Sequence, residues 1–71
     1  MKRHFEFVSN ESAKFWEIAV NGNEATVRFG RIGTDGQTQV KTLADASVAT
    51  KHAEKLIKSK VAKGYCEMAV C

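Results

Sequence analysis

Proline is absent from these 71 residues, and no stretch rich in serine and glycine interrupts them. A flexible or proline-rich linker between two domains is therefore not expected. A chain of this length makes a single domain, residues 1–71, with a core only one thin layer deep. Hydrophobic residues make up 44% of the sequence and charged residues 27%, which is typical of a globular fold rather than a disordered segment.

Cysteine and histidine are scarce as well. Cys66 and Cys71 both lie near the end of the sequence, while His4 and His52 are isolated. A disulfide-stapled secreted domain needs more cysteines, spread along the chain, and a zinc site needs about four ligands at defined spacing. We therefore expect reduced thiols, no metal and no cofactor.

No run of apolar residues approaches the roughly 18 that a membrane-spanning helix requires. The opening residues, MKRHFEF, include basic side chains but not the apolar segment of a signal peptide. We expect a cytoplasmic location without membrane contact. The net charge of +3 fits a nucleic-acid partner without requiring one.

Alternating apolar and polar residues predict four strands separated by turn-forming residues. We place the strands at residues 4–8, 14–20, 24–32 and 37–43. Asn21-Gly22 predicts a tight hairpin with positive φ at both positions. A second turn is predicted from Gly33 to Gly36, where Asp35-Gly36 has the same hairpin chemistry. Gly22, Gly33 and Gly36 are therefore the expected structural turn residues.

The period changes to that of a helix over residues 45–64. The apolar positions there are Ala49, Ala53, Leu56, Ile57 and Val61. Asp45 is a suitable N-cap, and Gly64 stands where a C′ glycine is expected. A last short strand is predicted at residues 65–70. The fold class is therefore α+β, an antiparallel sheet of four to five strands with one helix packed across it.

The lysines of the predicted helix invite a binding interpretation, but Lys51, Lys55 and Lys58 share one stripe that is typical of a solvated face. His52 lies near the buried stripe, and we expect it to be packed rather than a ligand.

No catalytic arrangement is evident in the sequence. The three glycines of residues 30–36 match neither a P-loop nor a dinucleotide-binding motif, because they fall in a hairpin and no Gly-Lys-Ser/Thr follows. We predict that the chain is not an enzyme.

The stretch VRFGRIGTDGQ, residues 27–37, offers binding features instead. Phe29 can stack on a base or a ribose, and Arg28 and Arg31 can bond to phosphate. Gly30 lets another backbone or a sugar approach closely. Two interpretations stay open here. Phe29 either faces a ligand or points into the core, with Gly30 marking a bulge.

At FGRIGTDGQ the sequence resembles a WGR domain, a module named after a Trp-Gly-Arg tripeptide. SAKFWEIAV (12–20) is similar to the family strand that begins with a lysine and two aromatics. ASVATKHAEKLIKSKVAKGY (46–65) is similar to the family's lysine-rich helix, which runs into Lys-Gly-Tyr. The resemblance spans nearly the whole chain in separated blocks. It implies an antiparallel sheet with one helix across it, as the elements above do.

In DNA-dependent poly(ADP-ribose) polymerases this module binds DNA at strand breaks, where its tryptophan packs on the ribose at the 5′ end. The resemblance implies the corresponding roles here for Lys14, Phe29, Arg31 and Tyr65. Phe29 stands where the family has its tryptophan. Phenylalanine keeps a ring face for stacking but lacks the indole N–H. Ala13 replaces the usual asparagine before the lysine.

Our first hypothesis is a non-enzymatic module that binds DNA ends or nicks. The expected nucleic-acid-binding residues are Lys14, Arg28, Phe29, Gly30, Arg31 and Tyr65. The alternative is a protein–protein docking module of a bacterial regulator, because aromatic and arginine side chains also anchor protein interfaces. Similar bacterial proteins carry the module alone or at the start of a longer chain described as a molybdate metabolism regulator.

Overall fold

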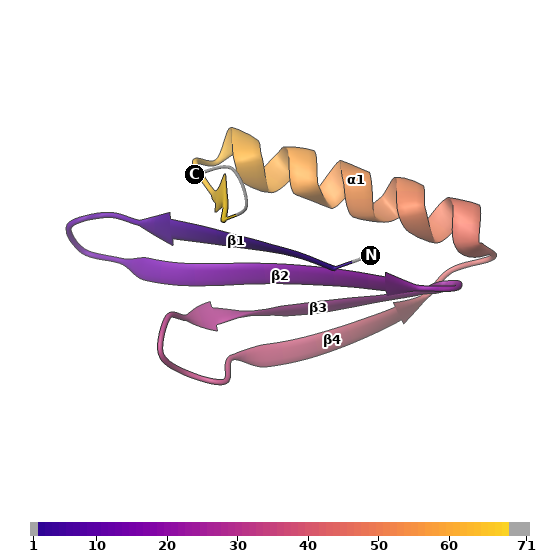
Figure 1. Cartoon of the computed structure of the whole chain (residues 1–71), viewed down its shortest axis with the longest axis horizontal. Helices are drawn as coiled ribbons and strands as arrows, with labels where there is room; N and C mark the ends of the chain where they lie inside the picture. Colours follow the sequence, from indigo (N-terminus) through magenta and orange to yellow (C-terminus); the bar gives the residue numbers. More distant parts are fainter. Residues whose placement is uncertain (1, 69–71) are drawn as a thin grey trace.

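The computed structural model describes residues 2–68. Figure 1 shows a meander of four strands followed by one long helix and a short strand. The elements are β1 (Lys2–Val8), β2 (Ala13–Asn21), β3 (Glu24–Arg31), β4 (Gln37–Thr42), α1 (Ala46–Ala62) and β5 (Cys66–Glu67). The predicted α+β class, with an antiparallel sheet and one helix, is confirmed.

The strand order of the sheet is β4-β3-β2-β1-β5, and every neighbouring pair is antiparallel. β5 returns from the end of α1 and pairs with β1 at Phe5 and Glu6. β1 is therefore flanked by strands on both sides, and the edge strands are β4 and β5. The strand predicted at residues 65–70 is two residues long, and positions 69 and 70 lie outside the described residues.

The helix covers one face of the sheet. Phe5, Trp16 and Phe29 are register partners across β1, β2 and β3, so their side chains form one row on the same face. Phe5 and Trp16 join a buried cluster with Ile18, and α1 adds Ala53 and Ile57 to it. Ala53 and Ile57 belong to the apolar stripe that the helical pattern predicted. The helix packs on β2 and β3, which leaves all of β4 exposed.

The first hairpin turns one residue later than predicted. Asn21 still pairs with Glu24, so the two loop residues are Gly22 and Asn23. Only Gly22 has a positive φ, +61°. Positive φ at both Asn21 and Gly22 is therefore a wrong prediction. A glycine at the first loop position followed by a residue of negative φ is the pattern of a type II′ turn, which matches the strand twist equally well.

The second turn also differs from the prediction. The chain turns from Arg31 to Thr34, whose backbone N–H donates to the Arg31 carbonyl at 3.1 Å, with Gly33 at φ +94°. Asp35 and Gly36 therefore do not form a tight two-residue hairpin. Gly36 instead lies against Gly30, since a Cβ on Gly30 would be 2.8 Å from the Gly36 Cα. The chain's own backbone fills the space that Gly30 leaves open.

Both ends of the helix follow the sequence prediction. The Asp45 carboxylate accepts a hydrogen bond from the Val48 backbone N–H at 2.9 Å, and Gly64 has a φ of +107° just after the C-cap. Of the predicted apolar stripe, Val61 is 52% exposed. Cys66 is disulfide-bonded, so the expected reduced thiol is wrong there.

Candidate nucleic-acid interface

Three of the predicted site residues lie at one end of the sheet. β2 begins there, and β3 and α1 end there, as Figure 1 shows. Lys14 and Arg31 are register partners, and each stands two residues from the core row, on the face that carries α1. Tyr65 follows the last turn of α1, and its ring packs against Phe7 with 5.5 Å between centroids. The topology thus brings together residues from the start, middle and end of the chain.

Phe29 points into the core, as one of the two interpretations expected, but the β2–β3 register passes through Gly30 without the expected bulge. Its ring is half-buried and packs against the core cluster. The same ring lines a hollow of about 300 Å³ between α1 and the sheet, together with Trp16 and Tyr65. Trp16 itself is only 4% exposed. Phe29 is therefore a core residue with one accessible side, and that side belongs to an aromatic-walled hollow.

Lys60, which the sequence prediction missed, belongs to the same hollow. Its Nζ lies 5.8 Å from the Trp16 ring centroid and 5.6 Å from that of Tyr65, distances typical of cation–π contacts. Burial lowers the pKa of Lys60, and the positive charges of Lys63 and Lys14 lower it further. These three amines therefore share one region of positive potential.

We call this region the basic–aromatic end. Its members are the cations Lys14, Arg31, Lys60 and Lys63 and the rings of Trp16, Phe29 and Tyr65. None of the four cations forms a salt bridge with another described residue. Lys14 and Arg31 moreover oppose each other across two strands, where like charges are destabilising. A site that keeps uncompensated cations together in this way is suited to an anion.

Arg28 and Gly30 do not join the basic–aromatic end. Each is one residue away from the Phe29 row, so both lie on the opposite face of the sheet. The Arg28 guanidinium lies 4.9 Å from the Phe15 ring centroid, and its Nε is 3.5 Å from a Glu17 carboxylate oxygen. Gly30 is covered by Gly36. The structure thus places four of the six predicted residues together and separates these two.

On this opposite face the charges neutralise one another. Glu17 lies centrally, with its carboxylate 3.0 Å from His4 Nδ1 and 3.6 Å from Lys2 Nζ. The other ring nitrogen of His4 is 3.1 Å from Glu6, and the imidazole stacks on Phe15. Burial disfavours the charged form of His4, but the hydrogen bonds to Glu17 and, to a smaller extent, Glu6 hold the pKa of His4 above its ordinary value. The His4 bond and the charges of Lys2 and Arg28 outweigh burial in lowering the pKa of Glu17.

These pKa shifts predict how stability depends on pH. Because the folded pKa of His4 is raised, its contribution is complete below about pH 6.5, the unfolded value, and is lost as pH rises through the folded pKa. The contribution of Glu17 is complete above about pH 4.5 and is lost as pH falls. In urea unfolding, we expect the free energy of unfolding of the wild type to fall by about 0.5 kcal/mol between pH 5.5 and pH 8, the size of effect that a partly exposed ion pair has. The His4→Gln variant should not show this fall. An equal loss in both proteins would show that another group titrates.

Lys60 could have been found from the sequence. The residues Ala49, Ala53, Leu56 and Lys60 follow the helical repeat of three to four, so Lys60 continues the buried stripe. Lys60 lies in that stripe, four residues before the C′ glycine Gly64 and five before Tyr65, so it is placed where the end of the helix meets the sheet. The sequence prediction considered only the lysines of the solvated stripe, which are Lys51, Lys55 and Lys58.

Within residues 2–68, no group of three or more His, Cys, Asp or Glu side chains is arranged to hold a metal ion. In the same part of the chain, no helix is both long and apolar enough to cross a membrane.

Comparisons with known proteins agree with the resemblance seen in the sequence. The family model described as the WGR domain matches residues 1–69. Protein YehF of Escherichia coli (strain K12) is 45% identical over 67 residues, which are 94% of this chain and 24% of that protein. The uncharacterized protein YfeS of the same organism is 37% identical over 67 residues, again 94% of this chain and 28% of that protein.

A solved structure shares the fold. A crystal structure of a protein from Bacteroides fragilis superposes with a TM-score of 0.93 at 51% sequence identity, over 96% of this chain and 19% of that one. The chain therefore spans about a quarter of the length of the two curated relatives and about a fifth of this structural relative.

Proposed function

This chain belongs to the WGR domain family, a family of binding modules rather than catalysts, and we propose that it binds DNA at strand ends or nicks through its basic–aromatic end. Lys14, Arg31 and Lys60 contact phosphate, and Phe29 and Tyr65 offer ring faces to the terminal sugar or base. A cytoplasmic location remains part of this proposal.

One observation carries the proposal. Lys14 and Arg31 are register partners on the face that carries α1, and no described carboxylate neutralises either one. On the other face, by contrast, Glu17 compensates the charges of Lys2, His4 and Arg28. A bound phosphate would relieve the repulsion between Lys14 and Arg31, since arginine forks onto phosphate oxygens and lysine adds a point charge.

The aromatic rings explain why an end suits this site better than a continuous duplex. The accessible side of Phe29 lies in a hollow shared with Trp16 and Tyr65. A base pair inside a duplex has neighbours stacked on both faces, so only a terminal or nicked position has a free face to lay against a ring. Stacking on an aromatic ring contributes about 1–3 kcal/mol per base.

We expect fluorescence anisotropy to show tighter binding to a 5′-phosphorylated nicked duplex than to the same duplex sealed. The Arg31→Ala substitution should weaken nick binding about tenfold, because one charge-assisted contact of about 1.5 kcal/mol is lost. The wild-type affinity should fall with salt, with a log–log slope of about −0.9 per phosphate contacted.

Lys51→Ala is the matched control. Lys51 is exposed in α1, so this substitution removes one positive charge outside the basic–aromatic end. It should leave the preference for the nick intact. Equal affinity for nicked and sealed duplexes, unchanged by Arg31→Ala, would contradict end recognition.

A second candidate is a docking module for another domain. The observation that favours it is length, because this chain covers only 24% and 28% of its two curated relatives. The same Phe29 and Arg31 surface would then contact protein. A domain that binds there would compete with nicked DNA and bind in its absence. The association with molybdate regulators stays a prediction from the resemblance alone.

A further inference from the structure

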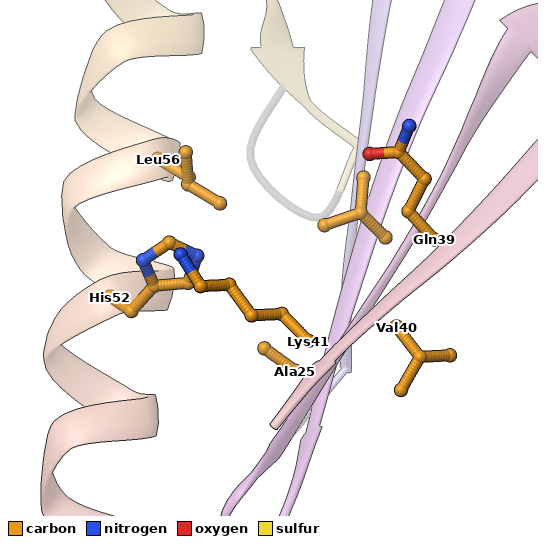
Figure 2. A pocket seen from close by; sticks show the side chains of 7 residues that line it. Ala25, Gln39, Val40, Lys41, His52 and Leu56 are labelled. Atoms are coloured by element: carbon orange, nitrogen blue, oxygen red, sulfur yellow. The ribbon is translucent and has the colours of Figure 1, made fainter. Parts of the chain in front are cut away.

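A groove leads away from the basic–aromatic end along the length of α1. One stretch of it, with a volume of about 600 Å³, is lined by residues of β3, β4 and α1. It shares Val27, Gln39 and Leu56 with the aromatic hollow described above. The stretch and the aromatic hollow therefore adjoin each other beside α1, over β3 and β4. Figure 2 shows this part, with Leu56 and His52 on the helix and Gln39 and Lys41 on β4.

The polar lining of the groove is entirely neutral or basic. The polar and charged residues that line its two parts are Gln39, Lys41, His52 and Lys60. Lys41 extends from β4 across the groove toward His52, whereas Val40 points to the other side of the strand (Figure 2). On the helix, Lys63 follows Lys60 by three residues and so stands on the same side. Glu54, the acid within this part of α1, lies near enough to Arg3 of β1 for its charge to help raise the pKa of that guanidinium.

The floor of the groove is apolar and changes character along its length. It is aromatic at the end near Trp16 and Phe29 and aliphatic near Val27, Leu56 and Ala25. Phe29 and Ala25 are four residues apart on β3, a distance of roughly 14 Å in a strand. At the stacked spacing of about 3.4 Å, this accommodates about three or four nucleotides. An apolar floor between basic walls is the arrangement used for single strands, whose bases stack and whose phosphates meet cations.

We propose that this groove binds a single-stranded tail that continues from the DNA end held at the basic–aromatic end. The preferred substrate is then a duplex with an unpaired overhang rather than a blunt end. The inference rests on the proposed function, because the tail enters the groove from the site that holds the end. An acidic peptide would meet the same basic walls, but the apolar floor beside the aromatic rings favours bases.

The test compares one 5′-phosphorylated DNA hairpin in three forms by anisotropy: blunt, with a tail of six thymidines on the 5′ strand, and with the same tail on the 3′ strand. One of the two tails should raise the affinity at least about fivefold, the effect of a single stacked base. A tail of abasic sugars should give less than half of that gain. Lys41→Gln should lower the affinity for the tailed DNA about threefold and leave blunt binding unchanged.

A sharper pair of variants places one new charge on either side of β4. Gln39→Glu puts it in the groove, and Thr38→Glu puts it on the opposite face of the same strand, where Thr38 is the register partner of Arg28. Gln39→Glu should abolish the gain from the tail, and Thr38→Glu should retain it.

The outcomes separate this inference from the proposed function. If blunt DNA binds through Arg31 but neither tail adds affinity, the groove proposal is wrong and end binding stands. If no DNA form binds, both fail together. If a labelled glutamate-rich peptide displaces the tail at equal concentration, the groove is a general acidic site and the single-strand proposal is overturned.

Discussion

Gly36→Ala is expected to destabilise the protein by about 3 kcal/mol, a large share of the roughly 4–10 kcal/mol that a domain of this size has. Two effects add. The Gly36 backbone has a φ of +70°, which costs an L-residue about 1–2 kcal/mol. A Cβ at this position would also be 2.7 Å from the Phe15 ring and nearer still to the Phe29 carbonyl oxygen, and overpacking of this kind costs about 1–3 kcal/mol. Thermal unfolding should show a melting temperature lower by about 15 °C.

Gly33→Ala is the matched control for that effect. Gly33 has a φ of +94°, but a Cβ there would have nothing within 4 Å. Only the backbone penalty applies, so the loss should be about 1–2 kcal/mol. If the two variants were equally stable, the close approach of Gly36 to Phe15 and Phe29 would not be part of the folded state. The comparison therefore measures how tightly the β3–β4 loop is held against the sheet.

Lys14→Glu is expected to move stability and binding in opposite directions. A glutamate at position 14 would face Arg31 across the β2–β3 register, so a repulsive pair becomes attractive. We expect the free energy of unfolding to rise by about 0.5 kcal/mol, a gain that should shrink in high salt. Affinity for nicked DNA should fall at least about tenfold, because a phosphate contact is replaced by repulsion.

Lys51→Glu carries the same change in net charge into an exposed position of α1. It should neither raise stability nor reduce nick binding more than about twofold. The result that would contradict the Lys14 prediction is nick binding at the wild-type level, since the Lys14 amine would then not face the phosphate. If Lys14→Glu raises stability and abolishes nick binding, Lys14 and Arg31 are a pair that serves DNA binding and destabilises the fold.

The sequence predicted the elements well because each has a strong local pattern. The strands alternate, and Asp45 and Gly64 mark the two ends of the helix. The turns were predicted less well, since which residue of Asn21-Gly22-Asn23 takes the positive φ depends on the strand register. β5 pairs for only two residues, at Cys66 and Glu67, and no periodicity can be read from so short a strand.

The site was only partly predictable for a similar reason. Sequence neighbours on a strand lie on opposite faces, so Arg28 and Phe29 could not both belong to one surface. Choosing between them required the register with Trp16, which is a property of the folded sheet. Lys60 was missed because its partners, Trp16 and Tyr65, come from β2 and from the chain after α1. The groove beside β4 likewise depends on how α1 crosses the sheet, which no local pattern specifies.

The pairing of β1 with β5 sets the order in which the fold can be completed. The first four strands join through loops of a few residues, and contacts so close in sequence form quickly. Phe5, by contrast, must find Glu67 near the opposite end of the described chain, and the entropy of closing a longer loop delays such contacts. Lys60 and Tyr65 come just before this closing strand. We therefore expect the meander to form first and the complete set of basic and aromatic side chains to assemble only in the last step of folding.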